Sequence, residues 1–600
     1  MRNLDARQRR WMVLRISILA VLLGGYALRV TARAWELQVA HAPGLRALAE
    51  EQYLREIRLA PKRGTIHDRH GAPLAVSVEV ESVWADPQEL RERGGDPRVV
   101  AGALEALLDV DRERIERRLS SDRRFVWVRR RVTPRLAAEL RARKEAAPDR
   151  LAGVHLDTEA RRYYPNGSLA AHVLGFANID GEGIEGLELS LEDELRGSRR
   201  TVPAIRDGRR RVVFSEQLLD DRAAQGDDLW LTLDKTLQHV AERELALAVR
   251  MSEARAGSVV VMDPTSGDIL ALASYPSYDP NAPGAFPPSH RRNRAVTDRF
   301  EPGSTVKPFT VAAALARGTI RAEESIECLD GAMEVAEYTI HDSTPYDRLT
   351  PAQILAFSSN IGTAQIGNTL GRAGLYRAFR RFGFGEVTGL PLPGEARGIL
   401  RHHRRWYEMD AATISFGQGL SVTNVQLATA MAVLANEGRL LRPRLVRRVT
   451  RAGEVVRESR MESRRQVVPP ATARLVADML TAVTGPEGTA PEAAIDGYLV
   501  AGKTGTAQKA DYVAGGYAED RWLASFAGCA PARNPRVVIS VVIDEPGVDH
   551  DGGRVAGPVF RRVGAMALRH LGVTAATGGQ ALLEEAAAAL GQPACNGRTE

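Results

Sequence analysis

The feature that most constrains this chain is an apolar segment near its N-terminus, because a segment that enters a membrane fixes the side on which the rest folds. Its uncharged core runs from Ile16 to Leu28, between Arg15 and Arg29. This core is shorter than the roughly 20 residues that span a bilayer. Arginine side chains can reach back to the interface and extend the span to residues 11–32. The arginine-rich end would then stay in the cytoplasm.

The predicted topology is a cytoplasmic tail over residues 1–10 and one anchor over 11–32 in the cytoplasmic (inner) membrane, with everything after it outside. A cleavable signal peptide is the rival interpretation, because Ala32 and Ala34 form a small-x-small cleavage site. A chain without any membrane segment is the third.

Length and composition indicate several globular domains. A chain of 600 residues exceeds what a single core supports. A net charge of +6 is spread too thinly to predict a nucleic-acid partner. The three cysteines, Cys328, Cys529 and Cys595, are too far apart to form a disulfide framework or a metal motif. We therefore expect no metal, no cofactor and no nucleic acid.

An N-terminal module is predicted over residues 45–220. It opens with a short amphipathic helix over Leu45–Leu59 and continues with strands over Gly64–Pro87. An arginine-rich helical region follows from Glu89 to Ala147. Gly- and Pro-rich turns then lead to a linker near Asp220. This mixture predicts an α+β domain.

A second module is predicted over residues 228–571, with the helix Lys235–Met251 near its start and a helical centre from Ser304 to about Gly438. Strands at both ends that bracket a helical centre are typical of an α/β fold whose terminal strands share one sheet. Those strands are Leu229–Leu233, Gly257–Met262, Leu499–Ala507, Trp522–Cys529 and Arg536–Ile543. The remaining tail, 572–600, is expected to be peripheral.

Lysine is rare here, with only six among 81 basic residues. A lysine retained in such a chain is a candidate for a task that arginine cannot do, such as giving up its proton. Lys307 lies three residues after Ser304, and Pro302 and Pro308 require a helix to begin close to that serine. A neutral amine on the same face can take the serine proton. An exposed serine and lysine on an ordinary helix is the alternative.

Two further groups of residues carry chemistry. Ser358 and Asn360 lie two positions apart after an apolar segment, so one can relay a proton while the other orients a substrate amide. A simple helix cap is the alternative. Lys503, Thr504, Gly505 and Thr506 follow a strand-like segment; the glycine would let a substrate backbone lie close, and the lysine and hydroxyls can hold a carboxylate. A surface hairpin is the alternative.

The sequence also contains motifs that compete with these three. Gly497, Gly502, Lys503 and Thr504 satisfy a phosphate-loop pattern, but strand-like residues fill the place of the loop. The glycines at 181, 183 and 186 fit a dinucleotide pattern that contains two glutamates, which would repel pyrophosphate. Residues 549–551 (Asp-His-Asp) and the His402–His403 pair lack a further spaced ligand for a metal. We interpret all of them as loops or strand.

Ser-x-x-Lys, Ser-x-Asn and Lys-Thr-Gly in this order resemble the penicillin-binding protein and serine β-lactamase superfamily. The segments 63–75 (RGTIHDRHGAPLA) and 162–188 resemble the N-terminal pedestal of class B penicillin-binding proteins. The segments 293–308 (NRAVTDRFEPGSTVKP), 415–426 (SFGQGLSVTNVQ) and 524–546 resemble the division-specific, FtsI-like members. The resemblance ends near Leu571.

The resemblance implies a peptidoglycan D,D-transpeptidase that cross-links stem peptides in septal wall synthesis and is trapped by β-lactams. It implies an antiparallel sheet flanked by helices, a helical subdomain and a pedestal of the dimerisation type. Ser304 would be the nucleophile and Lys307 its base, with Ser358 and Lys503 relaying a proton to the leaving amine. Asn360 would bind the substrate amide, and Thr504, Gly505 and Thr506 its carboxylate end. Backbone N–H groups of Ser304 and Thr506 would form the oxyanion hole.

The resemblance also implies partners. Stem peptides would be substrates, β-lactams covalent inhibitors, and a SEDS-family glycosyltransferase would work with other divisome proteins beside the chain. Three functions remain open from the residues alone: an elongation-type transpeptidase, a D,D-carboxypeptidase or β-lactamase, and a non-catalytic penicillin sensor or divisome scaffold.

Overall fold

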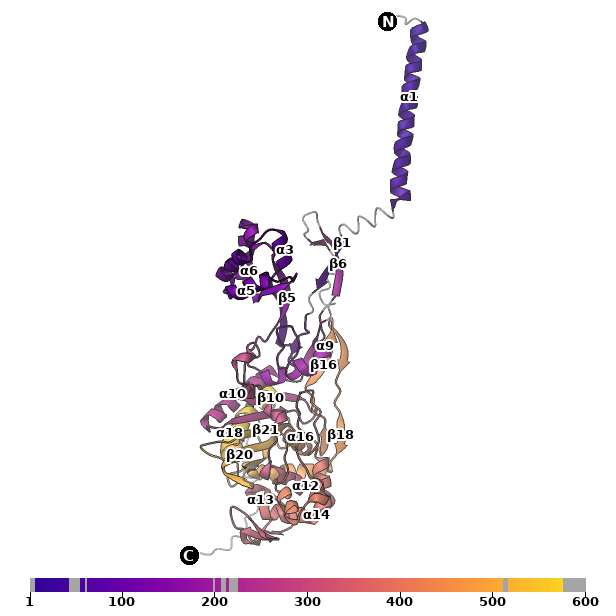
Figure 1. Cartoon of the computed structure of the whole chain (residues 1–600). Coiled ribbons are helices and arrows are strands. Elements are labelled where there is room, and N and C mark those ends of the chain that lie inside the picture. Colours follow the sequence, from indigo (N-terminus) through magenta and orange to yellow (C-terminus); the bar gives the residue numbers. More distant parts are fainter. Residues whose placement is uncertain are drawn as a thin grey trace. The chain divides into compact units, whose positions relative to one another are not determined.

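The computed structural model describes residues 6–42, 54–59, 62–197, 200–206, 212–214, 225–510 and 516–575 (Figure 1). The chain separates into two compact units. One comprises residues 1–61 and 198–225, and the other 62–197 and 226–600. The second unit carries both of the large predicted modules.

The first unit contains the predicted anchor. Helix α1 spans Ala6–Trp35 and continues into a π-helical turn, η1, over Glu36–Ala40. Residues 7–40 have a mean hydropathy of 1.9 in their most apolar window and are long enough to cross a membrane. The helix is longer than the predicted span, because its ends continue through the arginines that bound the apolar core. One apolar helix near the N-terminus fits a single-pass membrane protein.

The same unit holds a small antiparallel sheet of β1 (Leu54–Leu59), β6 (Arg200–Arg206) and β7 (Val212–Phe214). The predicted helix over Leu45–Leu59 is therefore wrong over its last six residues, and residues 45–53 lie outside the described ranges. Leu54 pairs with Ile205, and Leu59 with Arg200. Pairing with a strand about 150 residues away overrides the local helical pattern.

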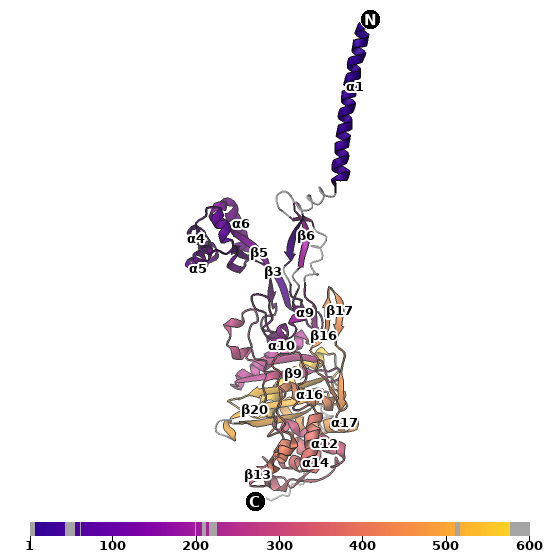
Figure 2. The ribbon, with the colours of Figure 1, turned by 45° about the vertical axis from the view of Figure 1, so that its right-hand side comes forward.

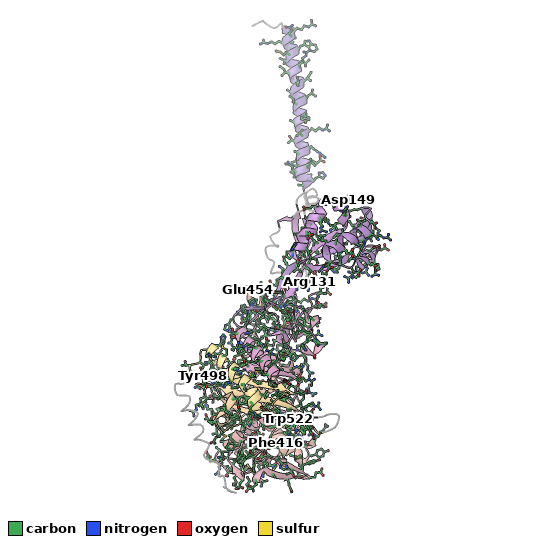
Figure 3. The ribbon with its side chains drawn as sticks, turned by 90° about the vertical axis from the view of Figure 1, so that its left-hand side faces the viewer. Arg131, Asp149, Phe416, Glu454, Tyr498 and Trp522 are labelled. Atoms are coloured by element: carbon green, nitrogen blue, oxygen red, sulfur yellow. The ribbon has the colours of Figure 1, made fainter. Side chains whose placement is uncertain are left out.

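In the second unit, a seven-stranded sheet has the order β17-β16-β8-β2-β3-β4, with β5 also paired to β3. The strand expected at 229–233 lies here as β8 (Asp228–Leu231), parallel to β2 (Ile66–His67) and antiparallel to β16 (Val446–Arg451). The sequence had predicted this strand in the sheet of the second module, so that prediction is wrong. Strands from both modules thus form one sheet. Figure 3 labels a residue of each outer strand, Arg131 in β4 and Glu454 in β17.

The predicted helical region after residue 89 is confirmed, with one strand inside it. Helices α4, α5 and α6 pack on the long antiparallel pair of β3 and β5 around a separate small apolar core. β4 interrupts the helices because alternate residues of Val126–Val132 bury toward this core. The bounds are β3 Pro73–Ala85, α3 Pro87–Glu92, α4 Pro97–Leu108, α5 Arg112–Leu119, β4 Val126–Val132, α6 Pro134–Ala146 and β5 Val154–Tyr163.

A buried ion triad ties the pedestal segments together. Glu188, whose side chain is fully buried, accepts hydrogen bonds from Arg63 Nε at 2.8 Å and Arg162 Nε at 2.6 Å. The arginine side chains are 5% and 2% exposed. Arg63 Nη1 also donates to Glu192 Oε2 at 2.6 Å, and Tyr164 Oη to Glu188 at 3.3 Å. The segments 63–75 and 162–188 therefore meet at their ends.

The second predicted module is built on a five-stranded antiparallel sheet of order β10-β9-β21-β20-β19. Figure 2 labels β9 and β20 of this sheet. Strands from the start and the end of the module share this sheet, as predicted. The strand β10 was not predicted. The bounds are β9 Ala256–Met262, β10 Ile269–Tyr275, β19 Ala501–Ala510, β20 Tyr517–Ala530 and β21 Val537–Asp544.

Helices cover both faces of this sheet. A Cβ on Gly257 would meet Leu245 and Val249 of α10 (Lys235–Met251). The next residue, Ser258, receives a hydrogen bond from Asn424 of α16 (Asn424–Ala435) at 2.9 Å. Neighbouring residues of a strand point to opposite faces, so α10 and α16 lie on opposite sides. Helix α18 (Gly552–His570) packs beside α10 on the first face.

The predicted helical centre is confirmed as a helical subdomain. It joins α12 (Lys307–Arg317), α13 (Pro351–Phe357), α14 (Asn360–Arg381), α15 (Glu408–Ser415) and α17 (Pro470–Leu480). Two small antiparallel strand pairs contact α14. They are β11 (Ile326–Glu327) with β14 (Arg348–Leu349) and β12 (Ala332–Val335) with β13 (Tyr338–His341). The first turn of α12 and the junction of α13 with α14 carry the predicted site.

Candidate active site

Ser304 lies in a short 3₁₀ turn, η7 (Gly303–Val306), that leads into α12. Pro308 falls in the first turn of this helix, so the predicted helix start is confirmed. Gly303 has a φ of +53° and donates its N–H to the Gly417 carbonyl at 3.1 Å. The serine is half-buried. The turn thus presents one partly accessible hydroxyl at the mouth of a helix.

Lys307 is completely buried, yet its amine has specific neighbours. Nζ donates to Asn360 Oδ1 at 2.8 Å, to Ser358 Oγ at 3.2 Å and, in a short contact, to the Ser358 carbonyl. Burial, and then the charge of Lys503, lower the pKa of Lys307 well below its usual value, and Asp342 opposes this. Burial thus favours the neutral form of this amine, which is the form that can act as a base.

The Ser358–Asn360 turn is both a helix junction and part of the site. Ser358 ends α13 with a φ of +64°, and Ser359 caps α14 by accepting the Gly362 N–H at 2.9 Å. The cap interpretation is therefore correct for Ser359. The side chains of Ser358 and Asn360 turn the other way, toward Lys307. Asn360 Nδ2 donates to the His341 carbonyl at 3.0 Å and keeps a second hydrogen for another acceptor.

Sequence reasoning missed Asp342, which anchors this turn. Its Oδ2 accepts from Ser359 Oγ at 2.5 Å, and its Oδ1 accepts from the Ile361 N–H at 3.2 Å and, in a short contact, from the Asn360 N–H. The carboxylate thus caps α14 at its positive end. Asp342 lies in an irregular loop before β14 with no periodic pattern around it, so no sequence signal marked it.

We expect Asp342→Asn to lower the acylation rate of the protein by a labelled penicillin about tenfold, because small displacements of positioned groups are costly. The asparagine side chain has one oxygen and no negative charge. It therefore cannot replace the carboxylate that accepts hydrogen bonds from the Ser359 hydroxyl and two N–H groups. Asp347→Asn is the matched control, since Asp347 is an exposed carboxylate of the same loop. Equal rates for wild type and Asp342→Asn would remove Asp342 from the positioning of this turn.

Strand β19 brings the third group to the site. Lys503 is fully buried, and its Nζ donates to Thr504 Oγ1 at 3.1 Å. Thr504 Oγ1 also lies 3.1 Å from Thr489 Oγ1, and Thr506 Oγ1 accepts the Gly552 N–H at 3.0 Å. Burial lowers the pKa of Lys503 to about 7, although Asp551 opposes the shift. This amine can both hold and release a proton near neutral pH.

Gly505 is required by the protein's own packing. A Cβ at this position would lie 2.8 Å from the Pro302 carbonyl oxygen, 2.9 Å from Thr305 Cγ2 and 2.5 Å from Ser525 Oγ. The glycine therefore lets the turn that carries Ser304 approach the strand. Contact with a substrate backbone, the role implied by the resemblance, stays a prediction.

The structure thus brings the predicted residues together at one place. Ser304 and Lys307 lie on one helical turn, Ser358 and Asn360 contact Lys307, and the charge of Lys503 reaches it. The phosphate-loop interpretation fails here, because residues 502–504 lie inside strand β19. Asp551 is the N-cap of α18, so the acidic loop at 549–551 has a structural role.

Comparisons with known proteins agree with this arrangement. A family model described as penicillin binding protein transpeptidase domain matches residues 257–564. Another, described as penicillin-binding protein dimerisation domain, matches residues 58–231.

Curated relatives match over most of their length. The chain is 37% identical to the probable peptidoglycan D,D-transpeptidase PenA of Neisseria meningitidis, over 93% of this chain and 92% of that one. It is 37% identical to the peptidoglycan D,D-transpeptidase FtsI of Escherichia coli, over 90% and 89%. The crystal structure of penicillin binding protein 3 from Mycobacterium tuberculosis, complexed with aztreonam, is similar at a TM-score of 0.65 with 27% identity, over 87% of this chain and 98% of that one.

Proposed function

The chain belongs to the class B penicillin-binding proteins of the division type, and we propose that it cross-links peptidoglycan through an acyl-enzyme on Ser304. It is a serine-type peptidoglycan D,D-transpeptidase that acts on peptidoglycan and binds β-lactams. The observation that supports the residue assignment is the buried Lys307 amine, held 3.2 Å from Ser358 Oγ and one helical turn from Ser304. The same arrangement offers a base, a proton relay and an anchored amide.

In the first step, Ser304 Oγ attacks the carbonyl carbon of the penultimate D-alanine of a stem peptide. The hydroxyl proton passes to the amine of Lys307, because burial lowers the pKa of this amine well below its usual value and favours its neutral form. The backbone N–H groups of Ser304 and Thr506 stabilise the oxyanion. Collapse of the intermediate breaks the C–N bond and leaves the peptide esterified to Ser304.

The leaving D-alanine amine needs a proton as that bond breaks. Ser358 Oγ lies beside Lys307, and Lys503 has a pKa of about 7, so the two can deliver this proton. Asn360 offers its second Nδ2 hydrogen to the substrate amide. The hydroxyls of Thr504 and Thr506 hold the terminal carboxylate. Lys307 becomes neutral again when its proton passes through Ser358 to the leaving amine. In the second step an amine of a neighbouring stem attacks the ester carbonyl and Lys307 accepts the amine proton. The ester C–O bond breaks, and this proton returns to Ser304 Oγ.

β-Lactams follow the first step only. Their leaving amine stays tethered to the acyl group, so the acceptor amine is excluded and the ester persists. Covalent inhibition then requires the same residues as catalysis.

We place the catalytic module outside the cytoplasmic membrane, with residues 1–10 inside and α1 as the anchor. Charge supports this orientation, because the arginines before the span favour the cytoplasmic side. The domain boundaries that we propose are 45–220 for the pedestal and 228–571 for the transpeptidase module, with 572–600 as a tail. A SEDS-family glycosyltransferase and other divisome membrane proteins are the proposed partners.

The test is to mix the purified chain with a stem-peptide thioester and a D-amino acid acceptor. We expect the transfer product to exceed the hydrolysis product and to disappear in Ser304→Ala. Hydrolysis without any transfer would instead assign the chain as a carboxypeptidase. Transfer that persists in Ser304→Ala would overturn the assignment of the nucleophile.

A further inference from the structure

Far from the serine, three side chains from distant parts of the sequence converge on one point. His70 lies in the turn between β2 and β3, Asp234 precedes α10, and His570 is the last residue of α18. Their ligand atoms all lie within 4.8 Å of one another. Within the part of the chain that the structure describes, no other group of three histidine, cysteine or carboxylate side chains meets this condition.

The carboxylate of Asp234 is fixed in place and divided between two tasks. Oδ1 caps α10, accepting the N–H groups of Thr236 at 3.0 Å and Leu237 at 3.2 Å. Oδ2 faces both histidines, 3.1 Å from His70 Nε2 and 2.8 Å from His570 Nε2. The side chain of Asp234 is 2% exposed, whereas those of His70 and His570 are 64% and 30% exposed. A buried oxygen thus meets two imidazole nitrogens on a side open to solvent.

The backbone holds His70 in register with this carboxylate. Asp68 Oδ1 accepts the N–H groups of His70 at 2.9 Å and Ala72 at 2.7 Å, which fixes the turn. The Arg69 N–H donates to the Leu233 carbonyl at 2.9 Å, directly before Asp234. The turn is therefore docked on the start of α10 without help from the His70 side chain. The His70 imidazole adds its contact with Asp234 Oδ2 to a turn that the backbone already holds in place.

We propose that His70, Asp234 and His570 bind a divalent transition-metal ion of the zinc class, with solvent as the fourth ligand. Two imidazoles and a carboxylate form a ligand set that suits zinc. Zinc–ligand bonds of about 2.0–2.2 Å in a tetrahedron place the ligand atoms about 3.3–3.5 Å apart. The two His–Asp separations need to open by only a few tenths of an ångström. The open fourth position lies on the exposed side.

The ion would clip the pedestal to the catalytic module. It joins the β2–β3 turn, the start of α10 and the end of α18, and these two helices cover one face of the catalytic sheet. Its proposed role is structural, since the ion joins segments that carry none of the residues proposed for catalysis. Binding by the folded state alone raises stability.

The probe is Zn²⁺ itself. The full chain in detergent micelles, made without a histidine tag and treated with chelator, is dialysed against ZnCl₂, and bound zinc and the thermal midpoint are measured. We expect one zinc per chain and a midpoint higher by several degrees. His70→Asn, Asp234→Asn and His570→Asn should each weaken binding at least tenfold and remove the shift. Asn at 234 preserves the helix cap, so this variant keeps α10 intact.

His239→Asn is the matched control, because His239 is an exposed histidine on α10. Acylation of Ser304 by labelled penicillin should be unchanged in the metal-free chain, so failure of this inference is distinct from failure of the proposed function. Absence of stoichiometric zinc, or zinc binding that survives in His70→Asn, would overturn the proposal. So would a midpoint that falls in His70→Asn but never responds to zinc, since hydrogen bonds alone would then explain the cluster.

Discussion

Lys307→Arg is expected to reduce the acylation rate by labelled penicillin roughly 10³-fold, as is Lys307→Met. The methionine removes the amine that accepts the serine proton. The arginine keeps a positive charge that it cannot give up near neutral pH. Its guanidinium must also fit where Lys307 is completely buried between Ser358 and Asn360. Lys307→Arg, although it keeps the positive charge, should therefore acylate no faster than Lys307→Met.

The measurement is the second-order acylation constant, taken from the rate at which fluorescent penicillin labels the chain. Lys509→Arg is the matched control, because the half-buried Lys509 pairs at 2.8 Å with Asp544 and an arginine can make the same ion pair. It should stay within twofold of wild type. A Lys307→Arg chain that acylates within tenfold of wild type would show that no neutral amine is needed.

The second large effect concerns stability. Glu188→Gln should destabilise the second unit by about 3–5 kcal/mol, because it leaves the guanidinium groups of Arg63 and Arg162 buried without their shared counter-charge. For a unit of this size, this corresponds to a fall of roughly 3–5 °C in the thermal midpoint. Amide hydrogen exchange should increase first in β2, β3 and the segment around Glu188.

Glu192→Gln is the control for Glu188→Gln. It shows whether the loss of stability comes from removing a buried carboxylate or from removing any carboxylate beside Arg63. Glu192 pairs with the same arginine, Arg63, but is 23% exposed, so its replacement should cost about 1 kcal/mol. Equal thermal midpoints for the two variants would mean that burial of the carboxylate does not determine how much it stabilises the protein. A Glu188→Gln midpoint within 1 °C of wild type would contradict the prediction outright.

The sequence predicted which residues meet at the proposed site, because each of them depends on local chemistry. Proline at 302 and 308 fixes where the helix starts, and this start sets the relation of Ser304 to Lys307. The scarcity of lysine singled out Lys307 and Lys503, and both amines are completely buried. Strands with long apolar runs, such as β21, were equally evident because both of their faces are covered.

The failures share a physical cause, which is pairing between residues far apart in the sequence. Residues 54–59 form a strand because β6 pairs with them, and β8 joins the sheet of the pedestal because β2 and β16 flank it. Asp342 matters only because the chain returns to the start of α14. The role of Gly505 in packing depends on the carbonyl of Pro302, about 200 residues earlier. No local pattern carries this information.

Ser304 alone is expected to carry the acyl group. The chain is incubated with labelled penicillin, digested with trypsin and analysed by mass spectrometry. Cleavage after Arg299 and Arg317 releases one peptide, residues 300–317, because the Lys307–Pro308 bond resists trypsin. We expect one penicilloyl adduct per chain, on Ser304 of this peptide. An unlabelled peptide, or an adduct on any other residue, would contradict the account.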